Sequence, residues 1–156
     1  AALAGADEIT LMLIDVLKGY TAAVLSTLLL HYHVIGPDNW LTLKLTFGLL
    51  AVVGHLFPVF ANFKGGKGVA SLLGMVLATH PEVAAVCIGI FLVVLIASQY
   101  VSLGSILAAL AFPILLLTSA FGEKESPLLI GFGFLVFLIV VFTHKKNIGR
   151  LMRGEE

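Results

Sequence analysis

The segment FANFKGGKGVA, residues 60–70, places two lysines and three glycines between apolar residues. Because glycine has no Cβ, successive backbone N–H groups can converge there, and the N-terminus of a following helix adds partial positive charge. With Lys67 and Lys64 as countercharges, these groups would bind an anion. The glycine spacing and the lack of Ser or Thr after the lysine argue against a nucleotide P-loop. By composition alone, a flexible turn whose lysines follow the positive-inside rule is an equal alternative.

Other polar residues have simpler interpretations when each is taken alone. Ser102 follows QYV at the start of an apolar run, as expected of a cap or a helix-start hydroxyl. His144 and Asn147 are three residues apart in THKKNIGR, so they would share a face at the end of the last helix, where a histidine can be merely interfacial. Asp15 and Lys18 have the same spacing inside the first apolar run, which favours an ion pair within one helix.

The elements that must position these residues are membrane helices. Of the 156 residues, 60% are hydrophobic and 12% are charged, and the mean hydropathy is +1.10. No ordinary soluble domain is so apolar, and several runs approach the roughly 20 residues that cross a bilayer. The net charge of zero argues against nucleic acid as a partner. Cys87 is the only cysteine of the chain, so no internal disulfide can form.

Charges, prolines and glycines divide the chain into six apolar segments. We place them near 9–30, 44–61, 67–80, 82–98, 101–119 and 127–143. The third is short, and HPE at 80–82 predicts a turn that joins it to the fourth as a helical hairpin. No strand-like alternation runs through them, which disfavours a transmembrane barrel. The predicted fold is all-α, a polytopic transmembrane helical bundle of about six membrane helices, in a single domain spanning 1–156.

The distribution of Lys and Arg predicts the orientation. Six spans would put the N-terminus, the 62–67 loop, the 99–101 turn and the C-terminal tail on one side of the membrane. That side carries Lys64, Lys67, Lys145, Lys146, Arg150 and Arg153, whereas the other side has only Lys44 and Lys124. The first side is therefore predicted to be cytoplasmic.

This topology brings several polar groups to one aqueous face. They are the glycine segment, Ser102, His144 and Asn147. Such a convergence suits a site for a phosphorylated small molecule. A small transporter or channel component for an anionic solute is the alternative, although transport would favour polar residues near mid-membrane. Apart from Asp15 and Lys18, the polar groups cluster at one face, which fits surface chemistry better. A purely structural scaffold would leave FKGGKG unexplained.

The segment GHLFPVFANFKGGKGVA, residues 54–70, resembles the second signature of the bacterial acyl-phosphate:glycerol-3-phosphate acyltransferases, the PlsY family. DVLKGY (15–20), YVSLGSILAA (100–109) and HKKNIGRLMRGEE (144–156) resemble further segments of that family in the same order. The resemblance implies a multi-pass enzyme of the bacterial cell membrane with a cytoplasmic active face. Such an enzyme transfers a fatty acyl group from acyl phosphate to the 1-hydroxyl of glycerol 3-phosphate, forming lysophosphatidic acid for phospholipid synthesis.

The resemblance also implies roles for individual residues. Lys67, His144 and Ser102 would be catalytic, and Lys64, Gly65, Gly66, Gly68 and Asn147 would bind substrate. The general base would be His144 or the donor's own phosphate, and the sequence leaves both open. No metal and no cofactor are expected, since N–H dipoles and lysines would neutralise the anionic substrates. The expected partners are the two substrates and membrane lipids, and we expect a monomer.

The chain departs from the family pattern at two places. The family has a further transmembrane helix and a Ser/Gly/Asn-rich cytoplasmic loop before the aspartate-bearing helix, whereas this sequence starts with AALAGADEIT. We therefore expect an N-terminally truncated chain that is a poor enzyme as it stands. Lys146 occupies the position where the family usually has an acidic residue just before the asparagine.

Overall fold

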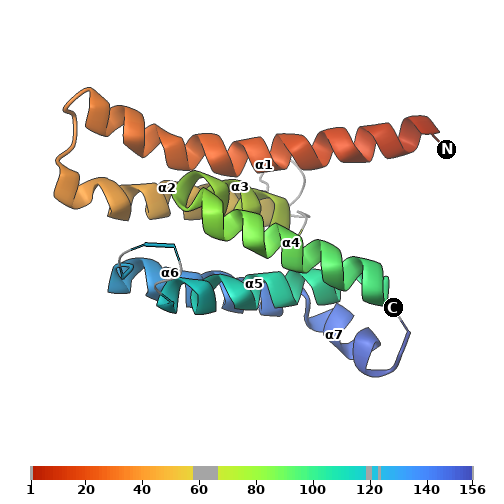
Figure 1. Ribbon diagram of the computed structural model, residues 1–156. Coiled ribbons are helices and arrows are strands. Elements are labelled where there is room, and N and C mark those ends of the chain that lie inside the picture. The colour runs from red at the N-terminus through yellow and green to blue at the C-terminus, as the bar shows by residue number, and fades with distance from the viewer. Residues whose placement is uncertain (1, 58–66, 119–120, 123, 156) are drawn as a thin grey trace. The chain divides into compact units, whose positions relative to one another are not determined.

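The structure, a computed structural model, describes residues 2–57, 67–118, 121–122 and 124–155, and the side chains from residue 7 onward. In these ranges it contains seven helices and no strand, which confirms the all-α prediction (Figure 1). The helices are α1 (Ala2–His31), α2 (Pro37–Leu56), α3 (Val69–Thr79), α4 (Pro81–Ser98), α5 (Val101–Leu117), α6 (Pro127–Thr143) and α7 (Lys145–Met152). The chain divides into two compact units, residues 1–80 and 81–156, and each is described by itself. The single domain expected from the sequence stays a prediction.

Three of the described helices are long and apolar enough to cross a membrane. They comprise Asp7–His31, Pro37–Leu56 and Pro81–Ser98, and the pair α6 and α7, bent by 65°, would add a fourth span. The apolar helices α3 and α5 are shorter, with 11 and 17 residues. Each of the six predicted apolar segments therefore contains a helix in its described residues, while only three or four satisfy the length for a full crossing.

The start of α2 was predicted wrongly. The sequence prediction began the second segment near residue 44, but the helix begins at Pro37 after Gly36 in an extended conformation. Proline suits the first position of a helix because its missing N–H would have no partner there, and Asp38 in the first turn complements the helix dipole. The polar residues of PDNW thus begin the helix rather than precede it.

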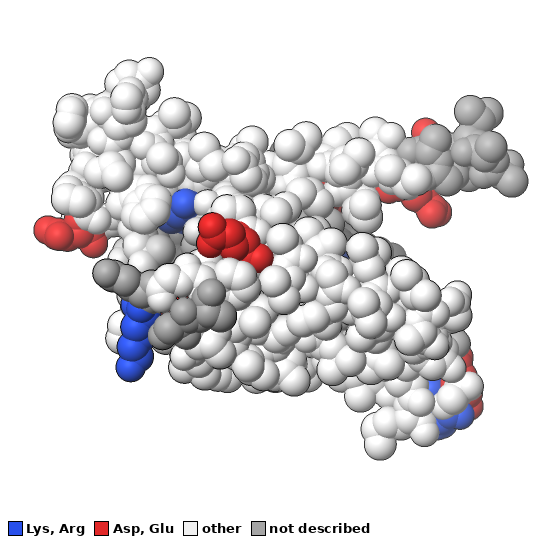
Figure 2. All heavy atoms as spheres, viewed as in Figure 1, with Lys and Arg blue, Asp and Glu red and all other residues white. Residues whose placement is uncertain are grey.

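Much of the exposed surface is apolar, as a lipid-facing protein requires. Most of the visible surface belongs to residues other than Lys, Arg, Asp and Glu (Figure 2). Large side chains on the outside include Ile96, which is 74% exposed, and Phe142, which is 70% exposed. In water such surface would be unfavourable, whereas lipid tails solvate it without cost.

In the first unit, α1 packs along both α2 and α3 (Figure 1). Two glycines allow the close approach of α1 and α3. A Cβ on Gly19 would overlap the carbonyl oxygen of Ser71, and a Cβ on Gly74 would overlap that of Val16. Small residues at such a crossing let two backbones pack in direct contact, which is a common device in membrane helices. The position of α3 is therefore set closely by α1.

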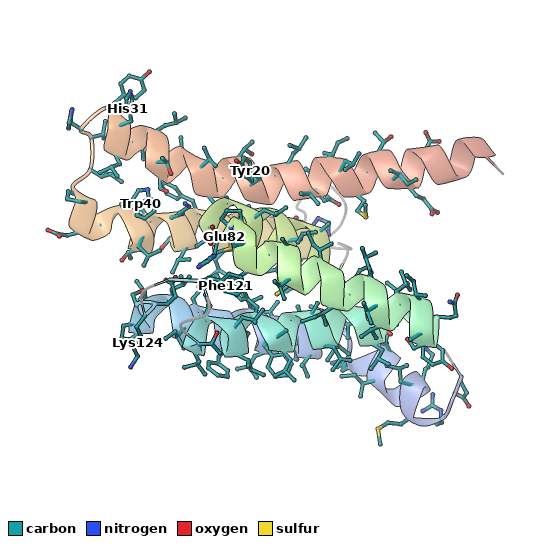
Figure 3. All side chains as sticks on the ribbon, viewed as in Figure 1. Tyr20, His31, Trp40, Glu82, Phe121 and Lys124 are labelled. Carbon is teal, nitrogen blue, oxygen red and sulfur yellow. The ribbon has the colours of Figure 1, made fainter. Side chains whose placement is uncertain are left out.

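Aromatic and polar side chains join α1 and α2 at the end where the two helices connect. Trp40 donates its indole N–H to Thr27 Oγ1 at 3.2 Å, and Lys44 Nζ lies 4.5 Å from the centroid of the Trp40 ring. His31 lies near the same end of the unit as Trp40 (Figure 3). Amphipathic rings gather in this way at membrane–water interfaces.

In the second unit, α5 packs against α4 and α6, and α7 contacts both α5 and α6. Ser126 caps α6 by accepting a hydrogen bond from Leu129 N at 3.2 Å. The sequence prediction treated the tail after residue 143 as the end of the last helix. The structure instead ends α6 at Thr143 and begins a separate helix, α7, at Lys145.

Candidate functional site

The N-terminus of α3 has the features expected of an anion site. Gly68 precedes the helix with φ 74° and ψ 0°, a left-handed conformation that favours glycine. The N-cap Gly68 has no side chain that could cap this end, and no acidic residue lies in the first turn, so among the described residues of α3 itself no carboxylate offsets the helix dipole. Lys67 is exposed directly before Gly68. The predicted site residues Lys64, Gly65 and Gly66 lie outside the described residues.

Both neighbouring helices hold the start of α3 in place. A Cβ on Gly68 would lie 3.2 Å from Leu56 Cδ2 and 3.4 Å from Val52 Cγ1, so the glycine sits directly on the last turn of α2. The carbonyl of Ser71, in the first turn of α3, rests on Gly19 of α1. Ser71 Oγ is buried and has no hydrogen-bond partner among the described residues. The start of α3 is therefore enclosed by α1 and α2.

An ionisable cluster joins α1 to α2 close to this point. Lys18 Nζ lies 2.9 Å from Asp15 Oδ1, which confirms the ion pair predicted from their spacing. His55, in the last turn of α2, adds a contact that we did not predict, since its Nδ1 lies 3.2 Å from the same carboxylate oxygen. The available signal was an ionisable residue near the end of an apolar helix, because such residues in membranes pair with one another.

His144 occupies the junction between α6 and α7. Its backbone N–H donates to Val140 O at 3.0 Å, and its backbone carbonyl accepts from Ile148 N at 2.8 Å. The ring Nδ1 lies 2.8 Å from Val140 O, and the side chain is almost fully buried. A carbonyl oxygen can only accept, so Nδ1 carries a proton, and Nε2 is the ring nitrogen that can gain or lose one.

Asn147 and Ser102 are the other predicted site residues of the second unit. Asn147 is buried in the first turn of α7, three residues after His144 as predicted, but on a helix that α6 does not continue. Ser102 is buried in the first turn of α5, where Tyr100 is the N-cap, so its hydroxyl is a helix-start group and not the cap. Buried polar side chains are costly unless they make hydrogen bonds, and both Ser102 and Asn147 have interaction partners in the structure.

The described residues therefore present two sets of candidate groups. Lys67 and Gly68 belong to the first unit, and Ser102, His144 and Asn147 belong to the second. Their meeting around one substrate stays a prediction. Within the described ranges, no group of three or more His, Cys, Asp or Glu residues could hold a metal ion.

Comparison with known proteins identifies the family. The family model for glycerol-3-phosphate acyltransferase matches residues 5–154. A glycerol-3-phosphate acyltransferase of Chlorobium phaeobacteroides (strain DSM 266) is 41% identical, over 92% of this chain and 72% of the relative. The enzyme of the same name from Salinibacter ruber is 45% identical over 123 residues, which are 78% of this chain and 54% of that protein.

A solved structure gives the same result for the fold. The crystal structure of PlsY (YgiH), an integral membrane glycerol 3-phosphate acyltransferase in its glycerol 3-phosphate form, superposes with a TM-score of 0.80 at 32% identity. The match covers 99% of this chain and 72% of that chain, and the lysophosphatidic acid form of PlsY matches equally well. These matches favour the transferase over the transporter. The chain belongs to the glycerol-3-phosphate acyltransferase family of integral membrane enzymes.

Proposed function

We propose that the chain transfers a fatty acyl group from acyl phosphate to the 1-hydroxyl of glycerol 3-phosphate and releases lysophosphatidic acid and inorganic phosphate. The acceptor and the product are the two molecules with which the similar PlsY structures are described. The observation that carries the proposal is the N-terminus of α3 in a chain of this family. It combines Lys67, the left-handed Gly68 and a first turn without acidic residues.

In the proposed reaction, the 1-hydroxyl oxygen attacks the acyl carbon and the bond from that carbon to the phosphate oxygen breaks. Phosphate leaves with the electron pair of that bond. The proton of the hydroxyl passes to a base, for which this chemistry offers His144 Nε2 and the donor phosphate. Acyl phosphate is already an activated anhydride, so positioning and charge stabilisation can supply much of the rate without a covalent intermediate.

Each candidate group has a role in this scheme. Lys67 and the N–H groups at the start of α3 would neutralise negative charge on the donor phosphate as it becomes the leaving group. His144 and Asn147 would bind glycerol 3-phosphate, and the Ser102 hydroxyl would contact substrate. We place these groups on the cytoplasmic side of the membrane, because most Lys and Arg residues of the chain lie in the segment before α3 and in the C-terminal segment from residue 145 onward.

The test is product formation by the reconstituted protein. Lysophosphatidic acid and released phosphate are measured with acyl phosphate and glycerol 3-phosphate, and each substrate is omitted in turn. Acyl thioesters replace acyl phosphate in a parallel reaction. We expect product only with acyl phosphate, and equal transfer from a thioester would refute the proposed donor.

A matched pair of lysine variants then tests the site. Lys67→Ala should lose activity, whereas Lys124→Ala removes an exposed lysine of the segment before α6 and should keep it. Equal activity of the two variants would contradict the assignment of Lys67 to the phosphate.

A further inference from the structure

The contact between Asp15 and His55 has no role in the proposed reaction. It links the middle of α1 to the last turn of α2, and both side chains are largely shielded, at 20% and 16% exposure. Lys18 is 59% exposed and approaches the same carboxylate oxygen from within α1. The shielded partner of Asp15 is therefore the histidine of the other helix.

Asp15 and His55 each lie within one helical turn of a residue that contacts the start of α3. Asp15 precedes Gly19 by one turn of α1, and the Cα of Gly19 supports the Ser71 carbonyl. His55 is adjacent to Leu56, whose side chain supports Gly68. The three helices thus form a closed arrangement, in which α1 contacts the first turn of α3, α2 contacts its N-cap Gly68, and α1 and α2 are joined by Asp15 and His55.

We propose that Asp15 and His55 are a positioning pair that fixes the α3 N-terminus, and with it Lys67, for binding a substrate phosphate. The inference rests on the proposed function. If the pair separates, the last turn of α2 can move away from α1, and Gly68 loses its support. A displacement of about 1 Å in a binding group can reduce the rate on the order of 100-fold.

A positioning role differs from a purely structural role in what the variants change. A structural pair affects how much protein folds and how stably, while the folded fraction keeps its substrate affinity. A positioning pair affects KM for the phosphorylated substrate, and a substitute side chain that restores the contact restores KM. Because the two residues act through one contact, the loss of both should cost no more than the loss of either.

The experiment compares His55→Leu, Asp15→Leu and their double variant in the reconstituted protein, at equal amounts of folded chain. We expect each of the three to raise KM for acyl phosphate or glycerol 3-phosphate and to lower kcat/KM by about 10- to 100-fold. His55→Asn, which keeps an N–H donor close to the Nδ1 position, should recover most of the loss. Lys18→Gln is the matched control and should stay within about twofold of the parent, since exposed ion pairs contribute little.

A second measurement does not depend on turnover, and it also serves if a leucine variant folds poorly. Val69→Cys in a Cys87→Ser background is labelled with a water-soluble thiol reagent, with and without inorganic phosphate. We expect phosphate to slow labelling in the parent and in His55→Asn but not in Asp15→Ala, in which the acceptor oxygen of the contact is lost. Parental KM in His55→Leu, additive losses in the double variant, or equal phosphate protection in Asp15→Ala would each overturn the positioning role. An inactive parent whose Val69→Cys is still protected by phosphate would instead refute only the proposed reaction.

Discussion

Replacement of Gly68 by alanine tests whether the geometry at the start of α3 supports catalysis. Gly68 has φ 74°, a conformation that costs an L-residue with a Cβ roughly 1–2 kcal/mol. The added Cβ would also lie 3.2 Å from Leu56 Cδ2, closer than an ordinary van der Waals contact. Relief of both effects requires the backbone beside Lys67 to shift.

Gly154 provides a matched control. It has φ 66°, but a Cβ there would meet nothing within 4 Å. Gly154→Ala therefore carries a similar conformational cost without the contact against α2, at a position outside the proposed site. We expect Gly68→Ala to lose about 1–2 kcal/mol of stability and to lower kcat/KM at least about tenfold, because a small displacement of a binding group reduces the rate steeply.

The assay is lysophosphatidic acid formation at equal folded protein, together with thermal unfolding in detergent. Gly154→Ala should keep the parental kcat/KM. If Gly68→Ala also keeps it, the left-handed residue is not needed to position Lys67, and the proposed anion site would be wrong. If both variants lose activity equally, backbone strain rather than the position of α3 explains the loss.

Three further outcomes are expected. Lys67→Ala should reduce kcat/KM a few-hundred-fold, or about 3 kcal/mol, because it removes a charge aimed at developing negative charge, and near-parental turnover would contradict this. Gly74→Ala should lower the thermal midpoint of unfolding by an amount equivalent to about 1–3 kcal/mol or more, since its Cβ would overlap the α1 backbone, and an unchanged midpoint would refute the close crossing. Cysteines that replace Lys145 and Asp38 in a Cys87→Ser background should react with an impermeant thiol reagent from opposite sides of the membrane, and labelling of both from one side would overturn the predicted orientation.

Local signals in the sequence predicted most of the helices, because a membrane-spanning run satisfies its backbone as a helix or in a closed barrel, and these runs lack the alternation of barrel strands. The start of α2 was missed because Gly36, Pro37 and Asp38 were used as dividers between apolar segments, although proline and an acidic first turn are signals for a helix start. The separate helix α7 was missed for a different reason. His144 closes α6 by hydrogen bonds to Val140, and nothing in the residue order shows that the chain turns there.

Contacts between distant segments could not be predicted in the same way. The spacing of Asp15 and Lys18 predicted their ion pair, since residues three apart share a helix face. The partner from α2, His55, is separated from Asp15 by a whole hairpin, and its register depends on the packing of α1 against α2. The close approach of α1 and α3 at Gly19 likewise depends on which helix faces meet.

The bend at His144 ends the straight apolar helix α6, so the length of α6 determines how well this helix matches the hydrocarbon thickness of a bilayer. With 17 residues at 1.5 Å each, α6 is about 26 Å long, whereas a typical hydrocarbon core measures about 30 Å. Because α7 turns away by 65° and carries exposed basic side chains, the chain cannot make up the difference by continuing as an apolar helix. A helix shorter than the hydrocarbon core is accommodated by local thinning of the bilayer, by snorkelling of its flanking residues or by association with another helix. If His144 binds glycerol 3-phosphate as proposed, the hydrophobic thickness of the host membrane would affect how readily that water-soluble acceptor reaches the histidine.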